Sequence, residues 1–187
     1  MNIKPALVLS CVTTVVAALL IVAHNLTYVD TSGIITEKLM KKCVSLMGEG
    51  EYSIVTDWRA AGYAIDKPDS VSKLIVGDNG AVAFEIVANG YNKGGLDLLI
   101  SMQTDGSIAG IEIVSITETP GLGTNVNDEA FLSLFGGISD NAVIVKKTPS
   151  EAGEVEAVTG ATYSSKGVAA AVNTALGVYR RMAVGGQ

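Results

Sequence analysis

A long uncharged apolar segment opens the chain. Between Pro5 and Asn25 there is no Lys, Arg, Asp or Glu, and Ala, Val, Leu and Ile predominate. A helix of about 20 apolar residues is long enough to cross the hydrocarbon core of a bilayer. A signal peptide usually has a shorter apolar region, and Val22-Ala23-His24-Asn25 is a poor cleavage site. We therefore expect an uncleaved transmembrane anchor over residues 1–29, with Tyr28 at the interface, and a separate domain over residues 30–187.

Helical and then alternating periodicity follows the anchor. Apolar residues from Ile34 to Met47 predict a helix over about residues 32–47, capped by Thr31-Ser32 and ending at Gly48. Alternation of apolar and polar positions predicts strands over residues 52–58, 70–76, 81–88, 96–103 and 107–116. The short Gly-containing segments at 77–80 and 104–106 predict hairpin turns within this series of strands.

The pattern changes after residue 116. Residues 117–125 predict a loop, Asn127-Asp128-Glu129 opens a short helix, and residues 143–146 predict one more strand. A final helix is predicted from Ser164 or Ser165 to about Ala183. The fold class is therefore α+β: an antiparallel sheet flanked by helices and tethered by one N-terminal transmembrane helix.

Composition and charge exclude several classes of function. The chain has 13 Lys and Arg against 19 Asp and Glu, a net charge of −6, and only 5% aromatic residues. An acidic chain with few rings does not suit nucleic acid, whose phosphates need a basic surface. Cys11, Cys43 and His24 stand apart in the sequence, so we expect no disulfide and no metal site.

The charges that flank the anchor indicate its orientation. Lys4 and the amino terminus lie before the apolar segment, whereas Asp30 is the first charge after it. Positive charge favours the cytoplasmic side of a membrane. We expect a single-pass protein of the cell (inner) membrane, with its N-terminus in the cytoplasm and its domain on the outer (periplasmic or extracellular) face.

The segment from Glu156 to Gly167 carries the strongest chemical signal. From Thr159 onward it reads Thr159-Gly160-Ala161-Thr162-Tyr163-Ser164-Ser165-Lys166-Gly167, which places small and hydroxyl residues directly before a predicted helix. Free N–H groups at a helix start attract anions, and Lys166 adds a positive charge. These features predict a phosphate site, although a plain N-cap explains the hydroxyl groups equally well. The spacing of a P-loop is absent.

A second candidate segment lies about 40 residues upstream. Its sequence is Glu118-Thr119-Pro120-Gly121-Leu122-Gly123. Proline fixes one backbone angle, and two glycines allow a flat ligand to approach the backbone closely. A rigid connection between a strand and a helix is the alternative interpretation.

Together the two segments resemble the FMN-binding domain family. Thr159 to Ser164 resembles that family's flavinylation motif, S/T-G-A-T-x-S/T, and Glu118 to Gly123 resembles its second hallmark. The resemblance implies that Thr162 carries FMN through a phosphoester, attached by a dedicated flavin transferase that uses FAD. Gly90-Tyr91 resembles a further signature. The chain departs from the family in having Glu156 where Asp is frequent and Ile116 where His is frequent.

The resemblance also implies roles for single residues. Gly160 and Ala161 would make room for the cofactor, whereas Thr159, Ser164 and Lys166 would hold its phosphate. The segment from Glu118 to Gly123 would border the ribityl chain or the ring.

With its single span, the chain most resembles the G subunit of the Rnf complexes, which are ion-translocating ferredoxin:NAD⁺ oxidoreductases. We therefore expect an electron-transfer subunit that has no substrate chemistry of its own. The alternatives are the C subunit of the sodium-pumping NADH:quinone oxidoreductase, a stand-alone FMN-dependent reductase and an anchored module without flavin.

Overall fold

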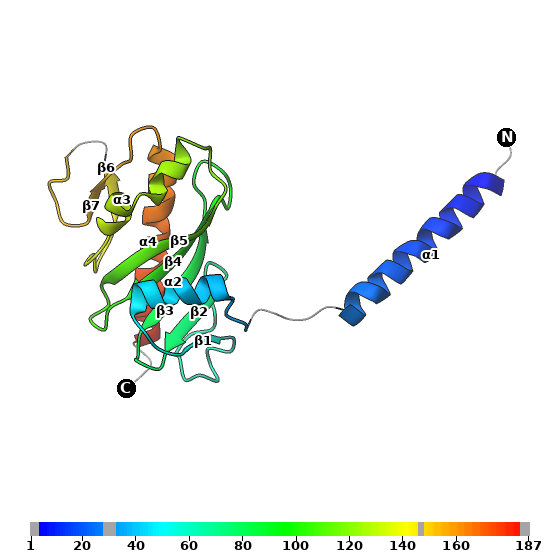
Figure 1. The fold of residues 1–187 in the computed structure, drawn as a ribbon, viewed down its shortest axis with the longest axis horizontal. Helices are drawn as coiled ribbons and strands as arrows, with labels where there is room; N and C mark the ends of the chain where they lie inside the picture. The colour runs from blue at the N-terminus through cyan, green and yellow to red at the C-terminus, as the bar shows by residue number, and fades with distance from the viewer. Residues whose placement is uncertain (1–3, 28–32, 146–147, 184–187) are drawn as a thin grey trace. The chain divides into compact units, whose positions relative to one another are not determined.

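The computed structural model describes residues 4–27, 33–145 and 148–183, and the chain divides into two compact units, Met1–Ser32 and Gly33–Gln187. The first unit contains one helix, α1 (Lys4–Thr27) (Figure 1). Within α1, Leu7–Thr27 is long and apolar enough to cross a membrane. The predicted apolar helix is therefore present. The predicted boundary at residues 29/30 and the interfacial Tyr28 lie outside the described residues.

The second unit is built on an antiparallel sheet of five strands in sequential order. The strands are β1 (Tyr52–Val55), β2 (Lys73–Gly77), β3 (Val82–Ala88), β4 (Leu96–Met102) and β5 (Ile108–Ile116). The five predicted strands are thus all present, and the two predicted hairpin turns contain Gly80 and Gly106, which both have positive φ. The first strand is shorter than predicted, because Trp58 leaves it and packs against Phe84 in the core.

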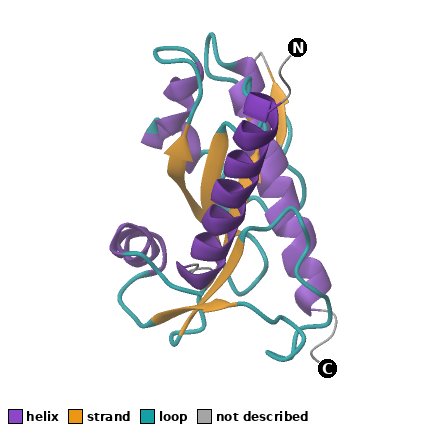
Figure 2. Ribbon diagram, turned by 90° about the vertical axis from the view of Figure 1, so that its right-hand side faces the viewer, coloured by secondary structure: helices purple, strands orange, loops and turns teal. Residues whose placement is uncertain are grey.

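Helices of the second unit itself cover both faces of its sheet (Figure 2). Neighbouring positions in a strand point to opposite faces. On β4, Leu98 and Ile100 belong to the large core that includes α4 (Thr162–Ala183), whereas Leu99 belongs to the smaller core beneath α2 (Glu37–Met47). The sheet is therefore buried on both faces, which explains the nearly continuous apolar run in β4.

Helix α2 begins later than the sequence predicted. Thr36 caps it by accepting a hydrogen bond from the N–H of Leu39 at 3.3 Å, and the helix starts at Glu37. The predicted cap, Thr31-Ser32, lies outside the described residues and before this start. The predicted C-terminal stop is confirmed, since Gly48 follows the helix with a φ of 84°.

The chain between β5 and α4 is partly different from the prediction. The predicted loop ends in a short 3₁₀ helix, η1 (Gly123–Asn127), followed by α3 (Glu129–Ser133), which Asp128 caps through the N–H of Ala130. Strand β6 (Val143–Val145) is as predicted, but it pairs in parallel with an unpredicted strand, β7 (Glu154–Glu156). Strand β7 reads Glu-Val-Glu, whose single apolar residue gives no strand signal, whereas β6 is the apolar run Val-Ile-Val.

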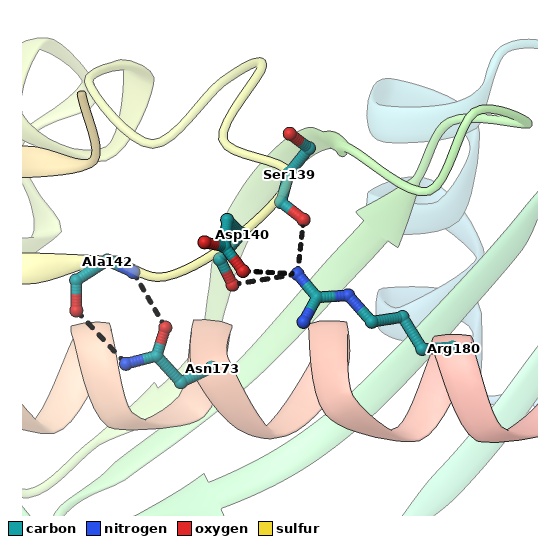
Figure 3. A network of polar contacts seen from close by, with 5 residues as sticks. All are labelled: Ser139, Asp140, Ala142, Asn173 and Arg180. Carbon is teal, nitrogen blue, oxygen red and sulfur yellow. Dashed lines mark hydrogen bonds and ion pairs between the residues drawn. The ribbon is translucent and has the colours of Figure 1, made fainter.

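Polar side chains of α4 fix the segment before β6 (Figure 3). Asn173 accepts from the N–H of Ala142 at 2.7 Å and donates to its carbonyl oxygen at 3.0 Å. Arg180 donates to the carbonyl oxygens of Ser139 and Asp140 and forms an ion pair with the Asp140 carboxylate at 3.1 Å. The segment that leads to β6 and β7 is therefore tied to α4.

Candidate functional site

The Thr159-Gly160 pair forms a tight turn between β7 and α4. The N–H of Ala161 donates to the carbonyl oxygen of Val158 at 2.9 Å, and Gly160 has a φ of 79°, which residues other than glycine rarely adopt. Ser165 is fully buried behind the turn. Its hydroxyl accepts from the N–H of Val158 at 3.1 Å and donates to the carbonyl oxygen of Ala161 at 3.0 Å. The turn is therefore held rigidly against α4.

Thr162 is the first residue of α4, two residues earlier than the predicted start. The prediction began the helix at Ser164 or Ser165, and this start was wrong, because both serines lie inside the first turn, where their hydroxyls bond to Glu118 and to the Ala161 carbonyl oxygen. Ala161, which precedes the helix, has no side-chain acceptor to cap it. Ala161 therefore caps none of the first-turn N–H groups, and those of Thr162, Tyr163 and Ser164 lie at the positive end of the helix dipole, which suits an anion. The Thr162 side chain is partly exposed at this end of the helix.

Glu118 lies beneath this helix start and connects it to a second loop. Its side chain is buried, and its Oε2 accepts from the Ser164 hydroxyl at 2.5 Å. The same oxygen accepts from the N–H of Tyr91, and Oε1 accepts from the N–H of Asn92, both at 3.0 Å. Ser164, which the sequence analysis placed at a phosphate, thus turns inward to Glu118.

Three glycines leave the space that the Glu118 carboxylate occupies. A Cβ added at Gly90, Gly95 or Gly123 would lie 2.7, 2.1 or 2.7 Å from a carboxylate oxygen. Real Cβ atoms essentially never come so close to another heavy atom. Gly123 therefore leaves room for the Glu118 carboxylate within the same motif. Gly90 and Gly95 leave room for it in the loop after β3.

Hydrogen bonds to Glu118 have a larger effect on the pKa of its carboxyl group than burial has. Burial raises the pKa of its carboxyl group, but the bonds from Ser164, Asn92 and Tyr91 outweigh burial and hold the pKa below its ordinary value. Glu118 is therefore a fixed anion at neutral pH.

The remaining residues of the upstream segment form the adjacent surface. The carbonyl oxygen of Thr119 accepts from the N–H of Leu122 at 3.2 Å, and Gly121 has a φ of 71°, so the segment turns sharply after Pro120. Leu122 is half exposed, and a Cβ at Gly160 would lie 3.4 Å from it. The two predicted motifs therefore meet in space.

Exposed apolar groups gather around Thr162. Tyr91 and Tyr163 are 72% and 68% exposed, and their rings meet edge to face with centroids 6.3 Å apart. Leu122 is the third large apolar side chain at this surface. Large apolar groups so exposed in an acidic domain indicate a binding surface.

The polar surroundings of the site are open to solvent. Thr159, Lys166 and Glu156 are all exposed. Thr159 also lines a cleft of about 550 Å³, whose other walls come from η1, α3 and Val158. In the described ranges no three His, Cys, Asp or Glu side chains are grouped to hold a metal ion.

Comparison with known proteins identifies the domain. Residues 90–177, which include both motifs and the loop at Tyr91, match the family described as the FMN-binding domain. This segment of the chain is therefore similar in sequence to that family. The match begins at Gly90, the first of the three glycines around Glu118.

Curated relatives are subunits of ion-translocating complexes. The chain is 35% identical over 99 residues to the G subunit of the proton-translocating ferredoxin:NAD(+) oxidoreductase complex of Clostridium ljungdahlii, covering 52% of this chain and 54% of the relative. It is 33% identical over 130 residues to the G subunit of the Na(+)-translocating ferredoxin:NAD(+) oxidoreductase complex of Acetobacterium woodii, covering 66% and 62%. The chain thus spans less than two thirds of either relative.

A solved structure shows the same fold. The C subunit of the Na(+)-translocating NADH-quinone reductase from Parabacteroides distasonis superposes with a TM-score of 0.52 at 24% identity, covering 80% of this chain and 84% of that one. The FMN-binding fold with its antiparallel sheet and flanking helices is therefore confirmed.

The structure brings most of the predicted site residues together. Glu118 and Gly123 meet Ser164, Leu122 meets Gly160, and the helix start places Thr162 beside them. Asn92, Gly95 and Ser165 also contribute to the site, although the sequence predicted no site role for them. The only signal for the first two was a glycine-rich stretch, Gly90-Tyr91-Asn92-Lys93-Gly94-Gly95, directly after a strand.

Proposed function

We propose that this chain is the electron-transfer flavoprotein subunit of a membrane-bound ion-translocating ferredoxin:NAD⁺ oxidoreductase (Rnf) complex. FMN is attached covalently to Thr162 as a phosphoester. The observation that carries the proposal is the position of Thr162 at the uncapped start of α4, between two rigid turns and an exposed apolar surface.

The residues present fit a phosphate and a flat ring. The first-turn N–H groups of α4 would bind the phosphate oxygens, with Lys166 one turn further on. Gly160 lacks a side chain that would crowd the phosphate, while Leu122, Tyr91 and Tyr163 present apolar surface next to it. FMN, when bound, supplies reversible electron transfer, and the protein tunes it by its contacts.

Attachment would follow from the exposure of Thr162. A flavin transferase would bring FAD to the partly exposed hydroxyl, and Oγ of Thr162 would form a bond to the flavin-side phosphorus. The phosphoanhydride bond of FAD breaks, AMP leaves and the hydroxyl proton passes to solvent. Thr162 takes no part in later electron transfer except as the tether.

The membrane helix fits the same function. Helix α1 would span the bilayer once, with the N-terminus in the cytoplasm and the FMN domain on the outer face. A tether prevents loss of a cofactor that cannot be resupplied easily outside the cytoplasm. The partners would be the other subunits of the complex, including the neighbouring electron donor and acceptor.

Thr162→Ala tests the attachment. We expect the intact mass of the full chain, produced with the transferase, to exceed the sequence mass by FMN less one water, and Thr162→Ala to lack this increase. The matched control is Thr174→Ala, which removes another hydroxyl of α4, one that donates to the Ala170 carbonyl oxygen of its own helix at 2.9 Å. This control should keep its flavin. Covalent flavin on Thr162→Ala would disprove the assignment.

A further inference from the structure

The buried carboxylate of Glu118 joins three segments around Thr162. We propose that Glu118 is a positioning residue, which as a fixed anion holds the first turn of α4 and the Tyr91 loop in register for FMN attachment and retention. This inference rests on the proposed function, because it concerns how the attachment residue is presented. Glu118 itself is buried and would not touch the flavin.

The ionised carboxylate suits the three donors that it meets. Two backbone N–H groups and one hydroxyl converge on its two oxygens, and an ionised carboxylate only accepts. A glutamine side chain would turn an amide NH₂ toward at least one of these donors. Glu118→Gln therefore removes the clamp while preserving its size.

The surrounding backbone keeps the carboxylate in one place. Gly90, Gly95 and Gly123 border it, and side chains at these positions would overlap its oxygens. The loop from Gly90 to Gly95 is closed by bonds from the N–H groups of both glycines to the Asn92 carbonyl oxygen, at 3.2 and 3.1 Å. Because Glu118 binds the N–H of Asn92 as well, the loop closes around the carboxylate.

The clamp reaches Thr162 through Ser164. Ser164 lies two residues after Thr162, within the same helical turn, so its bond to Glu118 fixes the rotation of that turn. Tyr91 is fixed by the same Glu118 oxygen, and its ring meets that of Tyr163. One carboxylate thus aligns the attachment hydroxyl with the aromatic pair beside it.

The test compares Glu118→Gln with Glu112→Gln in the full chain in detergent. Glu112→Gln removes the same charge from β5, at a partly exposed ion pair with Lys42. With FAD and the transferase, we expect Glu118→Gln to slow FMN attachment at least tenfold at saturating FAD, and Glu112→Gln to leave the rate unchanged. Equal rates for wild type and Glu118→Gln would overturn the proposal.

Amide hydrogen exchange of the flavin-free chain gives a readout that needs no cofactor. We expect Glu118→Gln to raise exchange at least tenfold in residues 89–95 and 158–166 and to leave β2 and β3 protected. The ratio of variant to wild type should fall as the pH drops through the lowered pKa of Glu118, where wild type loses its anion as well. Unchanged exchange in both segments would contradict the positioning role.

Ser164→Ala covers the case in which Glu118→Gln unfolds the domain. It removes one of the three bonds, so exchange should rise in residues 158–166 and not in residues 89–95. Exchange that rises evenly over the sheet would mean a purely structural role and would overturn the proposal. If wild type accepts no FMN, the proposed function fails, while the exchange experiment still decides the role of Glu118.

Discussion

Two inward-facing carboxylates of this domain, Glu118 and Asp97, lie close to Gly95 and behave oppositely. Glu118 receives three hydrogen bonds that hold its pKa below the ordinary value despite burial. Asp97 lies two residues after Gly95 on the α2 side of the sheet, and its Oδ1 is buried without a hydrogen-bond partner among the described residues. Burial and the nearby Glu85 raise the pKa of Asp97 to about 6, although Lys73 and Lys38 oppose the rise.

The difference shows that hydrogen-bond donors can offset burial: Ser164, Asn92 and Tyr91 supply them to Glu118, whereas burial of Asp97 is not offset in this way. Lys73 bonds both oxygens of Glu85 at 2.8 Å and so is engaged beside Asp97. The two main influences on Asp97 are therefore its burial and the negative charge of Glu85, which both raise its pKa. Glu118 instead accepts from two N–H groups of the loop after β3 and from the Ser164 hydroxyl in the first turn of α4. The fold therefore stabilises the ionised form of the Glu118 carboxyl group and destabilises that of Asp97.

Gly95→Ala should have the largest effect on stability, because it disturbs the hydrogen-bonded Glu118 carboxylate. The new Cβ would lie 2.1 Å from Oε1 of Glu118 and 3.1 Å from the Asn92 carbonyl oxygen. Overpacking together with loss of charged hydrogen bonds should lower the free energy of unfolding by about 2–4 kcal/mol. Urea denaturation followed by the fluorescence of Trp58, the single tryptophan, measures it.

Gly177→Ala is the control for this substitution. Gly177 lies inside α4 with no atom within 4 Å of an added Cβ. Alanine favours a helix interior over glycine by about 0.5–1 kcal/mol, so the control should be stabilised. A loss at Gly95 no larger than about 0.5 kcal/mol would mean that the carboxylate moves away at little cost.

The elements with strong periodicity were predictable from the sequence, and those fixed by distant contacts were not. The five strands and α4 have long apolar patterns, and all six are present in the structure, with ends that differ from the prediction by up to three residues. Strand β7 has three residues, and its partner is β6, so its pairing depends on chain elsewhere. Ser164 and Ser165 look like caps locally, but the first bonds to Glu118 and the second to Val158 and Ala161.

The two motifs of the candidate site were predictable from the sequence, but the contacts that join them around Glu118 were not. Residues 118–123 and 159–164 were found through their small and hydroxyl residues, and the structure joins them. The use of Gly95 depends on the fold, because its role is to leave room for a side chain 23 positions later in the chain. A glycine in a loop after a strand otherwise indicates only a turn.

Asp97→Asn should have a moderate effect on stability, because it removes the buried Asp97 charge, which is unfavourable. A rise in pKa from near 3.8 to about 6 corresponds nominally to about 3 kcal/mol, and partial exposure reduces this to about 1 kcal/mol. Because the folded pKa is raised, the ionised form destabilises the protein at pH 7. Asparagine should therefore stabilise it there by about 1 kcal/mol.

The pH dependence of this gain separates charge from shape. As pH falls from 7 through about 6 toward 4, Asp97 of the folded wild type becomes protonated and loses its charge. The difference in stability between the variant and the wild type should therefore shrink. Thermal unfolding of both proteins at pH 7 and pH 4 measures the difference. A gain of equal size at both pH values would assign the effect to packing and not to the charge.

Glu112→Gln should have the smallest effect, and it extends the comparison to a third carboxylate. Glu112 forms an ion pair with Lys42 at 2.8 Å, with side chains 26% and 21% exposed. Water and salt screen such a partly exposed pair, so its loss should cost less than about 1 kcal/mol, and the cost should shrink further in high salt. Thermal unfolding of wild type and variant at two salt concentrations measures it. A loss as large as that of Gly95→Ala would mean that ion pairing, and not backbone donors, is what stabilises the carboxylates of this domain.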